Sequence, residues 1–212
     1  MEGKGGDRLH NLDIQRTMPR GRPREFDTET ALNNAMLVFW RRGYRATSLD
    51  DLTEAMQVNK PSLYAAFGDK ESLFLQVIDF YANNLLAPRA SRLMQADDMR
   101  SGLERYFADL SEVVVGKSYP PGCLIACVLT EECAESEALK EKLAFMIKGA
   151  DERLAKFFNT HKEELKSDLS PKQAAKLLLS TIYGLSIRAR AGTPKRELVE
   201  ICEAFIKSIA KS

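Results

Sequence analysis

The segment from 43 to 70, GYRATSLDDLTEAMQVNKPSLYAAFGDK, constrains the fold more strongly than any other part of the chain. Within it, Ser48 is a favourable N-cap residue, and Asp51 stands three positions later, as in a capping box. The apolar residues after this cap recur at helical spacing over about two turns, as on one face of an amphipathic helix. The sequence therefore predicts a short helix over 48–56.

A second short helix is predicted after an interruption at 57–59. Asn59 is another favourable N-cap residue, and Pro61 is tolerated in a first helical turn. Leu63 and Phe67 form one apolar stripe of this helix. Two short helices joined by a tight turn, with the apolar side of the second facing inward, describe a helix-turn-helix. Many capped helical hairpins bind nothing, so the pattern alone leaves a purely structural role open.

The polar side of this second helix suits contact with DNA. Its side chains are short, or form hydrogen bonds, and can enter a major groove to meet base edges or phosphates. They belong to Lys60, Ser62, Tyr64 and Ala65.

An arginine-bearing segment precedes the helices, and the sequence predicts a disordered basic arm over 1–24. Between Arg8 and Arg24 there are five arginines against one aspartate, a local balance of +4. Three of the arginines alternate with Gly and Pro, which favour an extended chain, and extended arginine arms suit an A·T-rich minor groove. A merely solubilising tail is the alternative interpretation. Whether residues 1–17 are native is left open, since Met18 could itself be a start.

Apolar residues at helical spacing continue to the end of the chain, and no segment alternates as a strand does. The predicted fold class is all-α with about nine helices. Besides the two short ones, helices are expected after Asp27, over 69–86, 99–115, 123–133 and 136–161, from Ser170 past Leu185, and from Leu198 to Ile209. The helix over 69–86 leaves the helix-turn-helix without a Gly or Pro linker, and Pro88 is expected to separate it from the next helix.

A set of residues within 27–81 carries a resemblance to a known family. Its members are Phe39, Gly43, Tyr44, Thr47, Ser48, Val58, Leu63, Tyr64, Phe67, Lys70, Glu71, Leu73 and Phe74. Together they resemble the DNA-binding domain of the TetR-type (tetracycline-repressor-like) bacterial transcriptional regulators. The sequence departs from the family pattern at two positions. Gln57 stands where the family usually has Gly, at a cost of about 1 kcal/mol for a left-handed non-Gly residue, and Ala66 stands where it often has His.

The resemblance implies a helix-turn-helix domain over 25–70 and a helical effector-binding and dimerisation domain over 71–212. It also implies a repressor that binds double-stranded operator DNA as a homodimer and is released by a small-molecule effector. The residues expected to bind DNA are Arg20, Arg22, Arg24, Thr47, Ser48, Asn59, Lys60, Pro61, Ser62, Tyr64 and Lys70. One helix-turn-helix covers a single half-site, so useful specificity requires two. The resemblance places the dimer contact on the last two helices.

Residues of the middle helices are candidates for an effector pocket. They are Tyr106, Phe107, Cys123, Cys127, Phe145, Met146, Phe158 and Tyr183. Aromatic and Met residues at helical spacing are more often core than ligand-binding residues, so here too the pocket is implied by the resemblance.

Two cysteines of this set raise a second possibility. Cys123 and Cys127 are four residues apart and share a helix face, and a helix N-terminus would lower the pKa of Cys123. Some members of the family sense electrophiles through cysteine, and the turn around Cys123 resembles that group. A regulator that senses electrophiles or oxidants through Cys123 is therefore an alternative. The acidic cluster at 131–137 is interpreted as a solvated face.

Several classes of function are disfavoured. No catalytic constellation or phosphate-binding glycine loop is visible, so the chain is not expected to be an enzyme or to hold a cofactor. The chain has only two histidines, neither at ligand spacing, which argues against a metal site. No apolar run approaches the ~20 residues of a membrane span, and no membrane partner is expected. Nothing argues for export, so a cytoplasmic location is expected. An effector-independent architectural DNA-binding protein remains a further alternative.

Overall fold

The computed structural model describes residues 27–116 and 118–211, and helices dominate both stretches. The helices are α1 (Thr28–Arg42), α2 (Leu49–Met56), α3 (Lys60–Phe67), α4 (Lys70–Tyr81), η1 (Ala82–Leu86), α5 (Ala87–Met94), α6 (Met99–Val114), η2 (Ile125–Leu129), α7 (Thr130–Glu132), α8 (Glu137–Thr160), η3 (Lys162–Glu164), α9 (Pro171–Arg190) and α10 (Lys195–Ile209). The only β pairing among the described residues is an isolated bridge between Leu165 and Ala210. The predicted all-α class is confirmed. Across these same residues, no helix combines the length and the apolar character that crossing a membrane requires.

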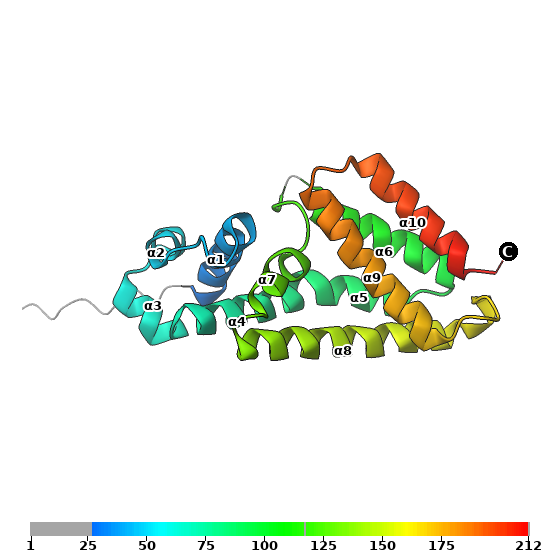
Figure 1. Cartoon of the computed structure of the whole chain (residues 1–212), viewed down its shortest axis with the longest axis horizontal. Coiled ribbons are helices and arrows are strands. Elements are labelled where there is room, and N and C mark those ends of the chain that lie inside the picture. Colours follow the sequence, from blue (N-terminus) through cyan, green and yellow to red (C-terminus); the bar gives the residue numbers. More distant parts are fainter. Residues whose placement is uncertain (1–26, 117, 212) are drawn as a thin grey trace, which may run out of the picture.

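Helices α1, α2 and α3 form a module at one end of an elongated molecule (Figure 1). The module begins at Asp27, whose side chain accepts a hydrogen bond from the Glu29 backbone N–H and caps α1. Gly43, at φ 82°, ends that helix, and its backbone N–H donates to the Phe39 carbonyl. Phe39 and Trp40 of α1 are fully buried in the core of the module.

The two caps of the helix-turn-helix form as predicted. Ser48 and Asp51 make a reciprocal capping box at α2, and Asn59 accepts a 2.8 Å hydrogen bond from the Ser62 backbone N–H at α3. Gln57 lies between the two helices at φ 55°, ψ 39°, in the left-handed region. The turn thus has the conformation that glycine adopts without strain, with glutamine in its place.

The predicted break at Pro88 is wrong. Helices α4, η1 and α5 follow one another without interruption, so that one rod runs from Lys70 to Met94. Pro88 lacks a backbone N–H, and in a regular α-helix its ring would collide with the carbonyl four residues earlier. The π-helical turn over Ala82–Leu86 bonds residues five apart, which moves the carbonyls away from the proline ring.

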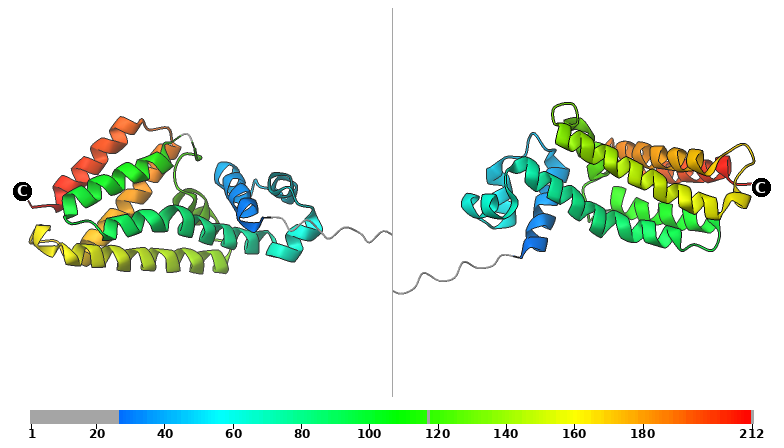
Figure 2. Two further views of the ribbon diagram at one scale, coloured as in Figure 1. Left: turned by 180° about the vertical axis from the view of Figure 1, so that it is seen from behind. Right: turned by 90° about the horizontal axis from the view of Figure 1, so that it is seen from below.

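The larger half of the molecule packs α6, α9 and α10 against one another, with α8 lying along α9 (Figures 1 and 2). The buried side chains form two clusters. The first includes α1–α4 together with the η2 residues Ile125 and Val128, and the second joins α5, α6, α8, α9 and α10. A segment of the C-terminal half therefore completes the core of the α1–α3 module.

Candidate nucleic-acid interface and effector site

Helix α3 has one buried side and one exposed side. Leu63 and Phe67 are buried against the module, whereas Lys60, Pro61 and Tyr64 are exposed. Tyr64 stands out because 48% of its surface is accessible although it is a large aromatic residue. This arrangement leaves a short, rigid helix with polar and aromatic groups directed outward, as a major-groove reading helix requires.

Charged groups flank this exposed side. The ammonium group of Lys60 lies 2.7 Å from Asp50 of α2, and this contact raises the pKa of Lys60. Lys70 begins α4 and lies 4.4 Å from the centre of the Tyr44 ring, a cation–π contact, while partial burial lowers the pKa of its side chain. Lys60 can turn toward a phosphate at modest cost, since exposed ion pairs are weak.

Three of the expected DNA-binding residues have structural tasks in the helix caps. The Ser48 hydroxyl donates to Asp51 at 2.7 Å, and the Asn59 side chain accepts from the Ser62 N–H. Thr47 is only 1% exposed, and its hydroxyl donates to the Gly43 carbonyl at 2.6 Å. The preceding turn therefore holds the Thr47 side chain away from the surface, and its contact with DNA stays a prediction from the sequence. Ser48 and Asn59 remain exposed beside their caps.

The arginines predicted to enter the minor groove, Arg20, Arg22 and Arg24, lie outside the described residues. So does the whole predicted arm over 1–24. Their role remains a prediction from the sequence.

Ion pairs and hydrogen bonds that no local sequence pattern indicates join the module to the larger half. The guanidinium of Arg45 donates to both carboxylate oxygens of Glu132, at 3.3 and 3.2 Å, and forms an ion pair with Glu135 at 2.7 Å. Arg190 of α9 donates to the Trp40 carbonyl at 2.8 Å. The acidic cluster at 131–137 is thus not simply a solvated face, because Glu132 is buried under Arg45.

Three of the effector candidates come together beneath α4. The Tyr81 hydroxyl donates to the Cys123 sulfur at 3.2 Å, in the buried interior. Tyr106 and Tyr183 lie near enough to Cys123 for a negative charge on the sulfur to raise the pKa of each hydroxyl. Burial is the larger cause for both, and it raises the pKa of Tyr106 to about 12. We call Tyr81, Tyr106, Cys123 and Tyr183 the tyrosine–thiol cluster.

A carboxylate adjoins this cluster. Asp151 of α8 acts electrostatically on Tyr183, and its Oδ1 atom is buried without a hydrogen-bond partner. Among the described residues, the other such side-chain atom is the indole nitrogen of Trp40, whose ring lies edge-on to Tyr81 with centroids 5.1 Å apart. An unpaired buried polar atom is costly, so a group that forms a hydrogen bond with Asp151 would be favoured there.

The prediction of a low pKa for Cys123 is wrong. The side chain is buried, and this burial raises the pKa of the thiol above its usual value. Hydrogen bonds from the Tyr81 hydroxyl and from the backbone N–H groups of Ala126 and Ile125 lower the pKa of Cys123, but by less than burial raises it. Desolvation outweighs the helix N-terminus because the thiolate would have to form away from water.

Of the other effector candidates, Cys127 lies near enough to Cys123 to act on it electrostatically, and Phe107, Phe145, Met146 and Phe158 have other surroundings. Phe145 is 73% exposed on α8, and Phe158 is a core residue that packs edge-on against Phe157. Phe107 lines a different cavity, between α6 and α10. The side chain of Cys127 is directed toward the Ser186 carbonyl at 3.7 Å, and Met146 is half-buried against the first core.

A metal centre finds no support in the part of the chain that the structure describes. No three or more His, Cys, Asp or Glu side chains gather there in a way that could hold an ion.

The fold and its sequence match known regulators. The family described as "Bacterial regulatory proteins, tetR family" matches residues 31–77. The chain is 34% identical to the HTH-type transcriptional repressor ComR of Escherichia coli (strain K12), over 89% of this chain and 91% of ComR. It is 31% identical to the HTH-type transcriptional repressor BdcR of the same strain, over 81% and 83% of the two chains.

A solved structure of a family member has a similar fold. A cysteine mutant of the TetR family transcriptional regulator CifR, complexed with 26-bp double-strand operator DNA, superposes with a TM-score of 0.80 and 32% identity. The match covers 88% of this chain and 99% of that one. The chain therefore belongs to the TetR family of bacterial regulatory proteins and is a DNA-binding regulator of transcription.

Proposed function

We propose that the protein is a homodimeric repressor that reads an operator through the exposed side of α3 and releases it when a small molecule binds at the tyrosine–thiol cluster. The observation that carries the proposal is the division of α3 into a buried side, Leu63 and Phe67, and an exposed side, Lys60, Pro61 and Tyr64. The two matched repressors and the operator complex of CifR support it.

Dimerisation through the last two helices is supported by an exposed apolar face on α9. Leu177 and Ile187 are large, apolar and exposed, and Gly184 lies between them with open space around its Cα. The spacings of seven and three residues put all three on one side of the helix. A slim, apolar face of this kind allows a second helix to approach closely. Two α3 helices held in this way would meet two operator half-sites about one DNA turn apart.

The effector site is supported by the polar groups of the tyrosine–thiol cluster together with Asp151. Tyrosine hydroxyls and the buried Oδ1 atom of the partly buried Asp151 offer hydrogen bonds of both kinds to a small molecule. The cluster lies against the α4–η1–α5 rod, since Tyr81 is the last residue of α4. The rod begins directly after α3, so a displacement of Tyr81 would also move α3.

The test has a binding part and a coupling part. Oligonucleotide selection with the full chain would yield a preferred duplex, and light scattering would give its stoichiometry, for which we expect two chains per duplex. A thermal-shift screen would then supply an effector, to be titrated with and without that duplex. We expect the duplex to weaken effector binding by about 5–150-fold, as coupling of ~1–3 kcal/mol demands. Equal effector affinity in both titrations would favour the architectural alternative.

The basic arm has its own test. Deleting residues 1–24 should lower DNA affinity and reduce the slope of log affinity against log salt by about 0.9 for each phosphate that the arm no longer neutralises. An unchanged slope would leave the arm as a solubilising tail.

A further inference from the structure

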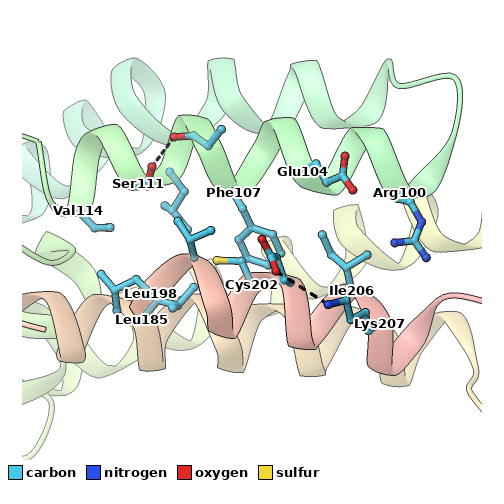
Figure 3. Close-up of a pocket in the computed structure, with 14 residues that line it drawn as sticks. Arg100, Glu104, Phe107, Ser111, Val114, Leu185, Leu198, Cys202, Ile206 and Lys207 are labelled. Carbon is cyan, nitrogen blue, oxygen red and sulfur yellow. Dashed lines mark hydrogen bonds and ion pairs between the residues drawn. The ribbon is translucent and has the colours of Figure 1, made fainter. Parts of the chain in front are cut away.

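A groove separate from both the α3 surface and the tyrosine–thiol cluster lies between α6 and α10. It encloses about 330 Å³, at the lower end of the range of small-molecule sites, roughly 300–1,000 Å³. Figure 3 shows the two helices side by side, with Leu185 of α9 beneath them. The groove therefore has two walls and a floor, each from a different helix.

The walls are apolar over most of their length. Phe107 and Val114 of α6 face Leu198, Cys202 and Ile206 of α10 (Figure 3), and Leu110 of α6 also lines the groove. Val199 lies at the rim, and 40% of its surface is accessible.

The charges around the groove cancel. At the open end of the groove, Arg100 and Glu104 of α6 stand across from Lys207 of α10 (Figure 3). Glu203 of α10 also lines the groove and forms an ion pair with Lys207 at 3.9 Å. Beyond the other end, Lys195 and Glu112 form an ion pair at 2.7 Å that ties α10 to α6. Two positive and two negative side chains at the open end offer no net attraction to an ion.

The thiol inside the groove adds no charge either. Cys202 is half-buried, and this burial raises its pKa to about 11, so the thiol stays protonated near neutral pH. A charged group carried to this depth would lose water without gaining an opposite charge, which is strongly unfavourable. An uncharged apolar molecule avoids that cost.

We propose that the groove between α6 and α10 is a second small-molecule site, which takes an uncharged, elongated apolar compound such as an alkyl or aryl alcohol. A small molecule is favoured over a partner helix because about 330 Å³ is less than the space taken by a single turn of a helix, which is about 10–12 Å across with a pitch of about 5.4 Å. The site rests on the groove alone and does not depend on the effector site at the tyrosine–thiol cluster.

Three eight-carbon probes test the chemical class: octan-1-ol, octanoate and octylammonium. Their affinities for the full chain would be measured by calorimetry, alongside the rate at which N-ethylmaleimide labels each cysteine, read by peptide mass spectrometry. We expect octan-1-ol to bind and to slow labelling of Cys202 but not of the distant Cys133. We expect both charged probes to bind about tenfold more weakly or worse, because their head groups are desolvated without a partner. No octan-1-ol binding, or tighter binding of either ion, would overturn the proposal.

A pair of variants locates the site. Val199→Trp fills the groove from its rim without removing a core side chain, whereas Met94→Trp adds the same group at an exposed position of α5 outside it. Calorimetry should show octan-1-ol binding lost in V199W and retained in M94W. Equal binding by the two variants would contradict the placement. Two further results together would overturn the proposal: labelling of Cys202 that slows as the protein concentration rises without any probe, and sedimentation that shows V199W dissociating an assembly. They would mean that a second copy of the chain covers the groove.

Discussion

Arg45 and Glu132 form a two-pronged contact that joins the DNA-binding module to the larger half of the molecule. The Nε atom of Arg45 lies 3.3 and 3.2 Å from the two carboxylate oxygens of Glu132, whose side chain is only 6% exposed. Arg45 lies in the turn that leads into α2, and Glu132 ends α7. A displacement of α7 would therefore move Arg45, and with it the turn that leads into α2.

Replacing Arg45 by Ala should destabilise the protein and loosen the module. The change leaves the buried Glu132 carboxylate without its partner, which costs about 1–3 kcal/mol. Urea denaturation would measure this destabilisation, and Arg196→Ala, at an exposed ion pair within α10, is the matched control and should change stability by less than about 0.5 kcal/mol. An equal change of stability in the two variants would mean that the contact between Arg45 and Glu132 does not stabilise the fold.

Replacing Gln57 by Gly should stabilise the protein. Gln57 holds φ 55°, and releasing a non-Gly residue from the left-handed region gains about 1 kcal/mol. The same measurement on Glu54→Gly, in the exposed interior of α2, should show a decrease in stability of about 1 kcal/mol. A destabilising Gln57→Gly would show that the glutamine side chain has a role beyond the turn.

The two sides of α3 should respond differently to substitution. Tyr64→Phe removes an exposed hydroxyl and is expected to weaken operator binding with the melting temperature unchanged. Phe67→Ala removes a buried ring and should cost roughly 3–5 kcal/mol of stability. Fluorescence anisotropy with the selected duplex and thermal melts would separate the effects. An equal fall of melting temperature in the two variants would contradict the assignment of the faces.

The capping box of α2 should make stability fall in acid. Hydrogen bonds from the Ser48 backbone N–H and hydroxyl, together with Arg42, lower the pKa of Asp51 from 3.8 to about 2. A folded-state pKa below the unfolded value means that the carboxylate stabilises the fold above 3.8, and that this stabilisation disappears as the pH falls toward 2. Urea midpoints of the wild type and Asp51→Asn should therefore differ by a constant amount near neutral pH and converge between those two values. A difference that persists at pH 2 would count against the ionised carboxylate.

The Cys123 thiol should react slowly with alkylating reagents in the folded protein. Its burial raises the pKa, so N-ethylmaleimide near neutral pH should label the half-buried Cys127 well before Cys123, and urea should abolish the order. Tyr81→Phe removes a hydrogen bond that lowers the pKa of Cys123, and it should slow labelling further. Rapid labelling of Cys123 in the folded protein would instead support the alternative of a cysteine sensor.

Much of the DNA-binding module is determined by short-range chemistry in the sequence. The caps at Ser48 and Asn59 depend on groups within about four residues of each other, so the order of residues suffices to predict them. The left-handed conformation at Gln57 is implied by the family resemblance instead. Helical spacing likewise predicts which side of α3 is buried. The all-α class and the family resemblance rest on the same local patterns.

Only the tertiary structure decided the features that depend on distant partners. Arg45 meets Glu132 across 87 positions, and Tyr81 meets Cys123 across 42, which no local pattern reveals. The raised pKa of Cys123 is set by its surroundings, because desolvation depends on the packing of several helices and not on the helix that carries the thiol. In the same way, Phe145 and Phe158 look alike as aromatic residues at helical spacing, yet the position of α8 leaves one in water and the other in the core.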